Sequence, residues 1–167
     1  MTLDHFNNFS ASQQKEELFK CCGCTAWSEK LVQQSPFASI EKLKQSSDEI
    51  WWQCEQKEWL EAFTHHPKIG DVKSLEKKFA STKEWASGEQ SSVTTASQDV
   101  LHQLKDGNEE YEKKFGYIFI VCATGKSATE MLVLLNNRLL NSPDAEIKIA
   151  AQEQNKITHL RIDKLFS

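Results

Sequence analysis

The chain has 167 residues, 39% of them hydrophobic, and 20 Lys and Arg against 24 Asp and Glu give a formal charge of -4. This size and composition predict one compact domain with an apolar core. The acidic balance, without a basic run or a basic-aromatic stripe, argues against nucleic acid as a partner. No apolar stretch approaches the roughly 20 residues of a membrane span, and the N-terminus lacks an export signal, so we expect no membrane association.

The cysteines indicate a reducing compartment. There are five, an odd number, and three of them stand together in Cys21–Cys24. This arrangement does not suit a disulfide framework. The C-terminal Leu165–Ser167 also differs from the Ser-Lys-Leu type of peroxisomal address. We therefore expect a cytoplasmic protein.

Helix signals begin near the N-terminus. Ser10 and Gln13 form a capping-box pattern that predicts a helix start, and Gly23 is suited to end that helix. Thr25–Gln34 is expected to form a second helix that stops before Pro36. Apolar residues then recur at helical spacing at Ile40, Leu43, Ile50, Trp51, Trp52, Trp59, Leu60 and Phe63. The three tryptophans of this stretch predict packed core rather than a ligand platform.

The stretch Thr64–Asp71 carries the first candidate for chemistry. Pro67 fixes its own φ and disfavours helical geometry in the preceding residue, so His66 should stand at a helix exit. A histidine held there can exchange a proton near neutrality, because its ordinary pKa is about 6.5. The alternative is a capping or solvated histidine without a catalytic role.

A metal site is a weaker interpretation of the same region. It would draw on His65, His66 and Asp71 together with the thiols of Cys21–Cys24. These thiols lack paired CxxC spacing, and adjacent histidines rarely bind one ion together. We expect no metal.

A second candidate precedes a long helix. A short helix over residues 71–79 leads to it, and Ser87-Gly88-Glu89-Gln90 then stands just before an apolar stripe of Val93, Ala96, Val100 and Leu104. Glu89 should therefore lie near a helix N-terminus, where backbone N–H groups and the helix dipole favour negative charge. A simple cap is the alternative interpretation.

The next segments combine two helices with one extended piece. Gly107 is expected to break the long helix, and Asn108–Phe115 to form another. Tyr117–Cys122 is the only strand-like run, and without a second strand to pair with it should be a buried extended link. Gly125-Lys126-Ser127 is not a phosphate-binding loop, because position 120 is Ile where that motif requires Gly.

The C-terminal part is again helical. Ser127 and Glu130 form a capping-box pattern, and Pro143 starts the last helix. Its apolar stripe is Ile147, Ala150, Ala151, Gln154, Ile157, Arg161 and Leu165. The chain is therefore predicted to be all-α, a single compact domain over residues 1–167 with about eight helices and one short extended segment.

Four motifs follow one another along the chain: His66–Gly70, Glu89-Gln90, Lys114–Ala123, and Lys156-Ile157 with Arg161. In this order they resemble the OHCU decarboxylase family, the 2-oxo-4-hydroxy-4-carboxy-5-ureidoimidazoline decarboxylases of urate catabolism. The resemblance covers nearly the whole chain. It implies an all-helical, cofactor-free homodimer that converts OHCU into (S)-allantoin and carbon dioxide.

The resemblance also implies which residues form the site. His66 corresponds to the catalytic histidine, and Glu89 would act with it by positioning the substrate. The expected substrate-binding residues are Pro67, Ala86, Ser87, Gly88, Gln90, Phe119, Ile120, Val121, Cys122, Ala123 and Arg161. Ala86 is a departure, since many members have serine there. A non-catalytic helical interaction module related to this family is the alternative, against which the intact His66, Glu89 and Gln90 argue.

Overall fold

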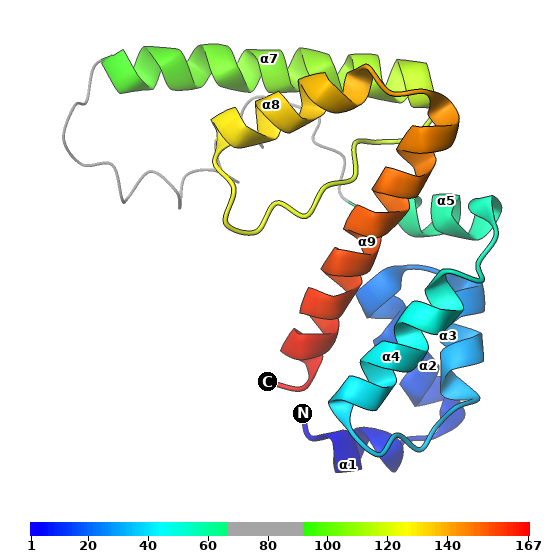
Figure 1. Ribbon diagram of the computed structural model, residues 1–167. Helices are drawn as coiled ribbons and strands as arrows, with labels where there is room; N and C mark the ends of the chain where they lie inside the picture. The colour runs from blue at the N-terminus through cyan, green and yellow to red at the C-terminus, as the bar shows by residue number, and fades with distance from the viewer. Residues whose placement is uncertain (67–91) are drawn as a thin grey trace. The chain divides into compact units, whose positions relative to one another are not determined.

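The computed structural model describes residues 1–66 and 92–167, except the side chains of 92–97 (Figure 1). Within these ranges it contains eight helices and no strand, which confirms the all-α prediction. The helices are α1 (Leu3–Asn7), α2 (Ala11–Cys22), α3 (Thr25–Val32), α4 (Ile40–Trp51), α5 (Gln56–Thr64), α7 (Ser92–Phe115), α8 (Ala128–Leu139) and α9 (Pro143–Leu165).

The backbone divides into two compact units. The first comprises Met1–His66, Ile120–Cys122 and Ile147–Ser167, and the second comprises Pro67–Phe119 and Ala123–Glu146. The first unit therefore brings three distant parts of the chain together, and these parts include the predicted helix exit at His66 and most of α9.

Helix α2 has the ends that its sequence predicts. Ser10 accepts a hydrogen bond from the backbone N–H of Gln13 and completes a capping box. Gly23 closes the helix in the left-handed conformation at φ 78°. A Cβ at Gly23 would lie 2.8 Å from Cβ of His65, so this glycine also lets α2 approach the end of α5.

The tryptophans of the first unit differ in burial. Trp51 is buried, and its indole N–H donates to the carbonyl of Ala151 at 3.0 Å. Trp59 is half-buried and donates to the carbonyl of Trp51 at 3.1 Å. Trp52 is 46% exposed, so the prediction that all three tryptophans are core was wrong for this residue. Trp52 is the C-cap of α4, where the chain leaves the buried face of the helix.

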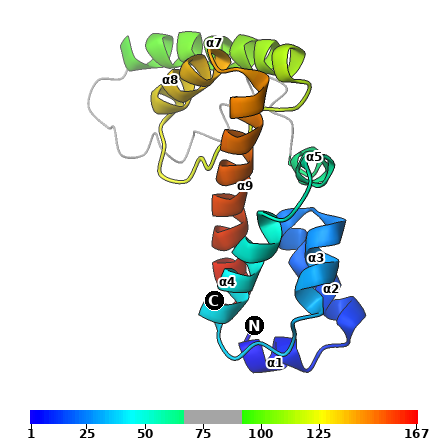
Figure 2. The same ribbon diagram turned by 45° about the vertical axis from the view of Figure 1, so that its right-hand side comes forward.

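Helix α7 is continuous through Gly107, so the predicted break there was wrong. Gly107 is buried, and a Cβ on it would lie 2.7 Å from Cδ2 of Leu135 on α8. The glycine therefore allows close packing between two helices rather than ending one. Figures 1 and 2 show α8 alongside α7.

A buried polar cluster supports the second unit. The guanidinium of Arg138 donates to Glu146 Oε1 from Nε at 2.7 Å and forms an ion pair with it through Nη2 at 2.6 Å. The hydroxyl of Tyr111 donates to the same carboxylate oxygen. Arg138 also lies over the ring of Phe119, 4.6 Å from its centroid. This cluster anchors the first part of the extended segment.

Residues 117–123 have no regular secondary structure, and only Phe119 and Ile120 are buried within them, so the predicted link is buried at its centre and half-buried elsewhere. The buried face of α9 differs from its predicted stripe. It continues from Gln154 to Thr158 and Ile162, whereas Arg161 is half-buried.

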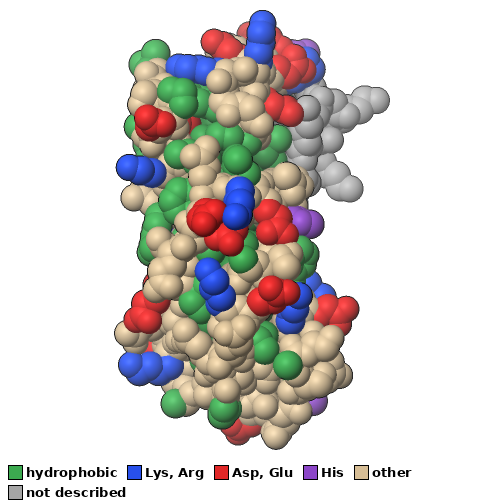
Figure 3. Space-filling model, turned by 90° about the vertical axis from the view of Figure 1, so that its right-hand side faces the viewer, with side chains coloured by type: hydrophobic (Ala, Val, Ile, Leu, Met, Phe, Trp, Pro, Cys, Tyr) green, Lys and Arg blue, Asp and Glu red, His purple; other side chains and the backbone are tan. Residues whose placement is uncertain are grey.

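The described surface carries charged side chains of both signs (Figure 3), as the nearly equal numbers of basic and acidic residues predict. On the face drawn in Figure 3, acidic and basic side chains are interspersed. Among the helices that the structure describes, none combines the length and apolarity required to cross a bilayer.

Candidate active site

Helix α5 ends where the sequence predicts. Glu55 and Glu58 form a capping box at its N-terminus, and His65 is its C-cap. The backbone N–H of His66 still donates to the carbonyl of Phe63 at 3.3 Å. His66 therefore stands at a helix exit, directly before Pro67, and its position is fixed by the last turn of α5.

The two adjacent histidines have different surroundings. The ring of His65 packs edge-on against Phe19, with centroids 5.0 Å apart, and its Cβ covers Gly23. His66 is half-buried, and its Nε2 contacts Oε1 of Gln154. His65 thus joins α5 to α2, and His66 is the histidine whose ring nitrogen meets a buried polar group.

The extended segment is attached to the same turn of α9. The backbone N–H of Cys122 donates to Oε2 of Glu153 at 2.7 Å. Glu153 also pairs with Lys156 at 2.5 Å. Because Glu153 and Gln154 are neighbours, one turn of α9 contacts both Cys122 and His66.

Arg161 lies farther along α9, and its Nη1 donates to the carbonyl of Cys21 at 3.2 Å. That carbonyl is at the C-terminus of α2, where the helix dipole favours a cation. Seven residues separate Arg161 from Gln154, which corresponds to about 10 Å along a helix and nearly the same face. A guanidinium has five N–H donors, so the bond to Cys21 uses only part of its capacity.

The predicted site is thus described in part. His66, Ile120, Val121, Cys122 and Arg161 belong to the first unit. Phe119 and Ala123 flank Ile120–Cys122 and belong to the second unit. The remaining predicted residues lie outside the described residues: Pro67, Ala86, Ser87, Gly88, Glu89 and Gln90.

Glu153 and Gln154 were not predicted as site residues. Gln154 was only part of the predicted stripe of α9. A glutamine within an apolar stripe was the available signal, because a buried amide requires hydrogen-bond partners.

Four of the five cysteines are buried thiols, and Cys122 is half-buried. Cys21, Cys22, Cys24 and Cys54 are buried and free of disulfides. Burial raises the pKa of Cys21 to about 11 and also raises that of Cys22. Over the residues that the structure describes, no group of three or more His, Cys, Asp or Glu side chains is arranged to hold a metal ion.

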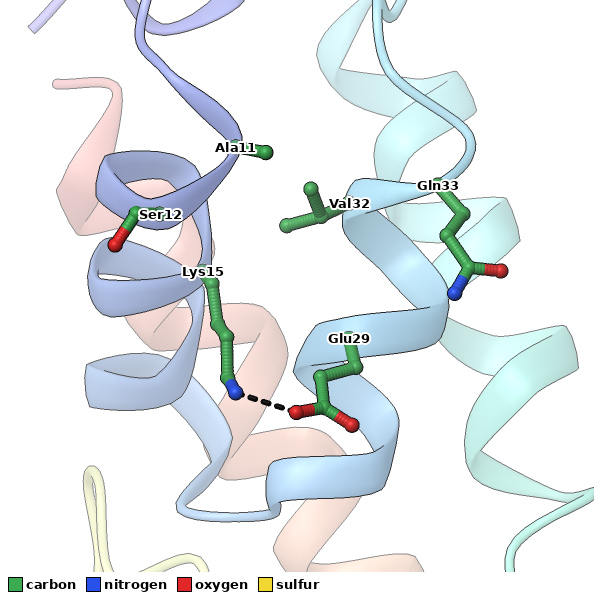
Figure 4. Close-up of a pocket in the computed structure, with 6 residues that line it drawn as sticks. All are labelled: Ala11, Ser12, Lys15, Glu29, Val32 and Gln33. Atoms are coloured by element: carbon green, nitrogen blue, oxygen red, sulfur yellow. Dashed lines mark hydrogen bonds and ion pairs between the residues drawn. The ribbon is translucent and has the colours of Figure 1, made fainter.

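A groove between α2 and α3 does not coincide with the predicted site. It has a volume of about 370 Å³ and is crossed by an ion pair between Lys15 and Glu29 at 2.5 Å (Figure 4). Its lining residues are Ala11, Ser12, Lys15, Glu29, Val32 and Gln33. None of the predicted site residues is among them.

Comparison with known proteins identifies relatives. The model of the OHCU decarboxylase family matches residues 7–163. The uric acid degradation bifunctional protein TTL of Arabidopsis thaliana is 39% identical over 154 residues, which cover 92% of this chain and 47% of that protein. The OHCU decarboxylase of Haloferax volcanii is 25% identical over 132 residues, covering 79% of this chain and 76% of that one. The chain thus spans less than half of the Arabidopsis relative.

Two solved structures are similar in fold to this chain. A crystal structure of OHCU decarboxylase in the presence of (S)-allantoin has 36% sequence identity and a TM-score of 0.71, covering 90% of this chain and 97% of that chain. A structure of (S)-allantoin synthase has a TM-score of 0.73 at 17% identity, covering 100% of this chain and 54% of that one. The second likeness concerns the fold alone.

Proposed function

We propose that this chain, which belongs to the OHCU decarboxylase family, converts OHCU into (S)-allantoin and carbon dioxide without a cofactor. The observation that carries the proposal is the family match over residues 7–163. The contact of His66 with α9 supports it, because it holds the imidazole in a defined position. The chain is accordingly proposed to be a carboxy-lyase that acts in urate degradation.

The substrate chemistry suits a site made only of protein groups. OHCU carries a carboxylate on a carbon that also bears a hydroxyl and adjoins a ring C=N bond. When carbon dioxide leaves, the electrons of the broken C–C bond can move into that C=N bond, so the ring serves as its own electron sink. The protein must orient the ring, stabilise the electron-rich intermediate and deliver a proton to one face.

Several of the predicted residues have a role in this scheme. His66 is the acid/base that handles the hydroxyl or the incoming proton, and Glu89 positions the substrate. Arg161 can offer further N–H donors to the substrate carboxylate, a pairing that suits the planar guanidinium. The backbone of Phe119–Ala123 lines the ring. The bond from the Cys122 N–H to Glu153 supports this role, because it holds that backbone in place.

The proposal also covers the domain organisation, oligomeric state and location of the protein. We propose one functional domain over residues 1–167, because the family match covers nearly all of it. A homodimer follows from the resemblance, and exposed apolar side chains such as Leu140, 84% exposed, are compatible with a subunit contact. A cytoplasmic location is supported by five free thiols.

The reaction can be tested directly. OHCU is generated from urate by the two preceding enzymes of the pathway, the purified chain is added, and circular dichroism follows the product. Rapid formation of (S)-allantoin, at a rate proportional to protein concentration, supports the proposal. Allantoin that forms slowly and as a racemate, as it does without protein, would reject it in favour of a non-catalytic helical module.

A further inference from the structure

The side chain of Gln154, which contacts His66, is hydrogen-bonded at both ends of its amide. It lies on α9 and is fully buried, at 0% exposure. Its amide nitrogen donates to the carbonyl of Cys22 at 3.3 Å and to Oγ1 of Thr158 at 3.3 Å. Its amide oxygen contacts Nε2 of His66. Both ends of the amide are therefore engaged.

These contacts determine which way the amide faces. The carbonyl of Cys22 can only accept a hydrogen bond. The hydroxyl of Thr158 donates its own proton to the backbone carbonyl of Gln154 at 3.0 Å, so it presents a lone pair to the amide. A flipped amide would place its oxygen against two acceptors and leave buried groups unpaired, which is costly. The amide oxygen therefore faces His66.

We infer that Gln154 is a positioning residue that fixes His66 with a proton on Nε2, so that Nδ1 exchanges protons in the reaction. An amide oxygen only accepts, and Nε2 must therefore donate to it. In the neutral ring the basic lone pair is then on Nδ1. The catalytic part of this inference rests on the proposed function, whereas the tautomer does not.

A neutral partner also limits what Gln154 does to the imidazole. A carboxylate at this position would stabilise the charged ring and raise its pKa, as an opposite charge does. The amide orients the ring without adding such a charge. Exchanging Gln154 for Glu therefore keeps an acceptor opposite Nε2 and adds a negative charge when the carboxyl group is ionised.

The tautomer can be measured in the unmodified protein. The full chain is labelled with ¹⁵N, and long-range ¹H–¹⁵N correlation spectra resolve the two ring nitrogens of each of the 5 histidines. His66 is assigned by comparison with His66→Asn. Protonation at Nε2 in the neutral ring is the expected result. A neutral ring protonated at Nδ1 overturns the inference whatever the variants do.

Variants then test the catalytic consequence. Gln154→Met keeps similar volume but removes the acceptor, so we expect mixed tautomers and a kcat about tenfold lower at nearly unchanged KM, the order that one hydrogen bond provides. Gln152→Met is the matched control, because Gln152 is an exposed glutamine on the same helix. Wild-type tautomer and kcat in Gln154→Met would overturn the inference.

Gln154→Glu supplies a readout that a purely structural role would not change. When the new carboxyl group is ionised, the limb of the pH–kcat/KM profile that belongs to His66 should move to higher pH. An unmoved profile in a folded variant whose carboxyl group is ionised contradicts the inference. Far-UV circular dichroism checks that each variant is folded. If both variants unfold, the inference is decided by the His66 tautomer measured in the ¹H–¹⁵N spectrum of the wild-type protein. A wild-type chain with the Nε2 tautomer that forms no (S)-allantoin would reject the proposed function but not the assigned tautomer.

Discussion

Gly23→Ala should both destabilise the fold and disturb His66. Gly23 has φ 78°, and an L-residue there costs about 1–2 kcal/mol. The new Cβ would lie 2.8 Å from Cβ of His65, an atom close to the backbone that cannot swing away. Overpacking of this kind costs about 1–3 kcal/mol. Together we expect a loss of about 2–5 kcal/mol in the free energy of unfolding.

The assay is urea unfolding followed by circular dichroism, with Gly116→Ala as the control. Gly116 follows α7 at φ 79°, and its N–H donates to the carbonyl of Glu112 as that of Gly23 does to Phe19. No atom lies within 4 Å of a Cβ built on Gly116. Gly116→Ala therefore carries the left-handed cost without the clash. Equal destabilisation by the two variants would refute the packing argument, and kcat should fall only in Gly23→Ala.

Further predictions concern the helix contact, the buried ion pair and a buried thiol. Gly107→Ala should lower the thermal midpoint, because its Cβ would meet Leu135 Cδ2 at 2.7 Å, and an unchanged midpoint contradicts this. Leu135 is fully buried, so Leu135→Ala is destabilising by itself, but the double variant should lose less than the sum of the two single losses because the contact is relieved. Arg138→Met should cost about 3–5 kcal/mol in urea unfolding by leaving the carboxylate of Glu146 buried without its cation, and a loss below 1 kcal/mol would argue against that pair. The pKa of Cys21 is raised from 9.0 to about 11, so above pH 9 the folded state binds more protons than the unfolded state. The contribution of this thiol to stability is therefore lost as pH rises towards 11. Cys21→Ala should flatten the alkaline decline in the free energy of unfolding, and an equally steep decline would contradict this prediction.

Features set by nearby residues were predictable from the sequence. The start of α2 at Ser10, its stop at Gly23 and the start of α8 at Ser127 depend on hydrogen bonds within one turn of the chain. The helix exit at His66 likewise follows from the adjacent Pro67 and the last turn of α5. Such local rules predicted the helical class and most helix positions.

Features set by residues distant in the sequence could not be predicted in this way. Gly107 was interpreted as a helix break because its contact with Leu135 is not apparent from local sequence. His65 and His66 have the same chemistry, and only Phe19 and Gln154 distinguish their roles. These partners come from other helices, so no local pattern could assign them.

The measurement that tests the account most directly compares two neighbouring substitutions in the allantoin assay. His66→Asn should lower kcat by about 10² to 10⁴, the usual contribution of a positioned acid/base. His65→Asn, which removes only the packing against Phe19, should keep most of the turnover and form the same S product. If His66→Asn formed (S)-allantoin at the wild-type rate, the assignment of His66 as the acid/base would be contradicted.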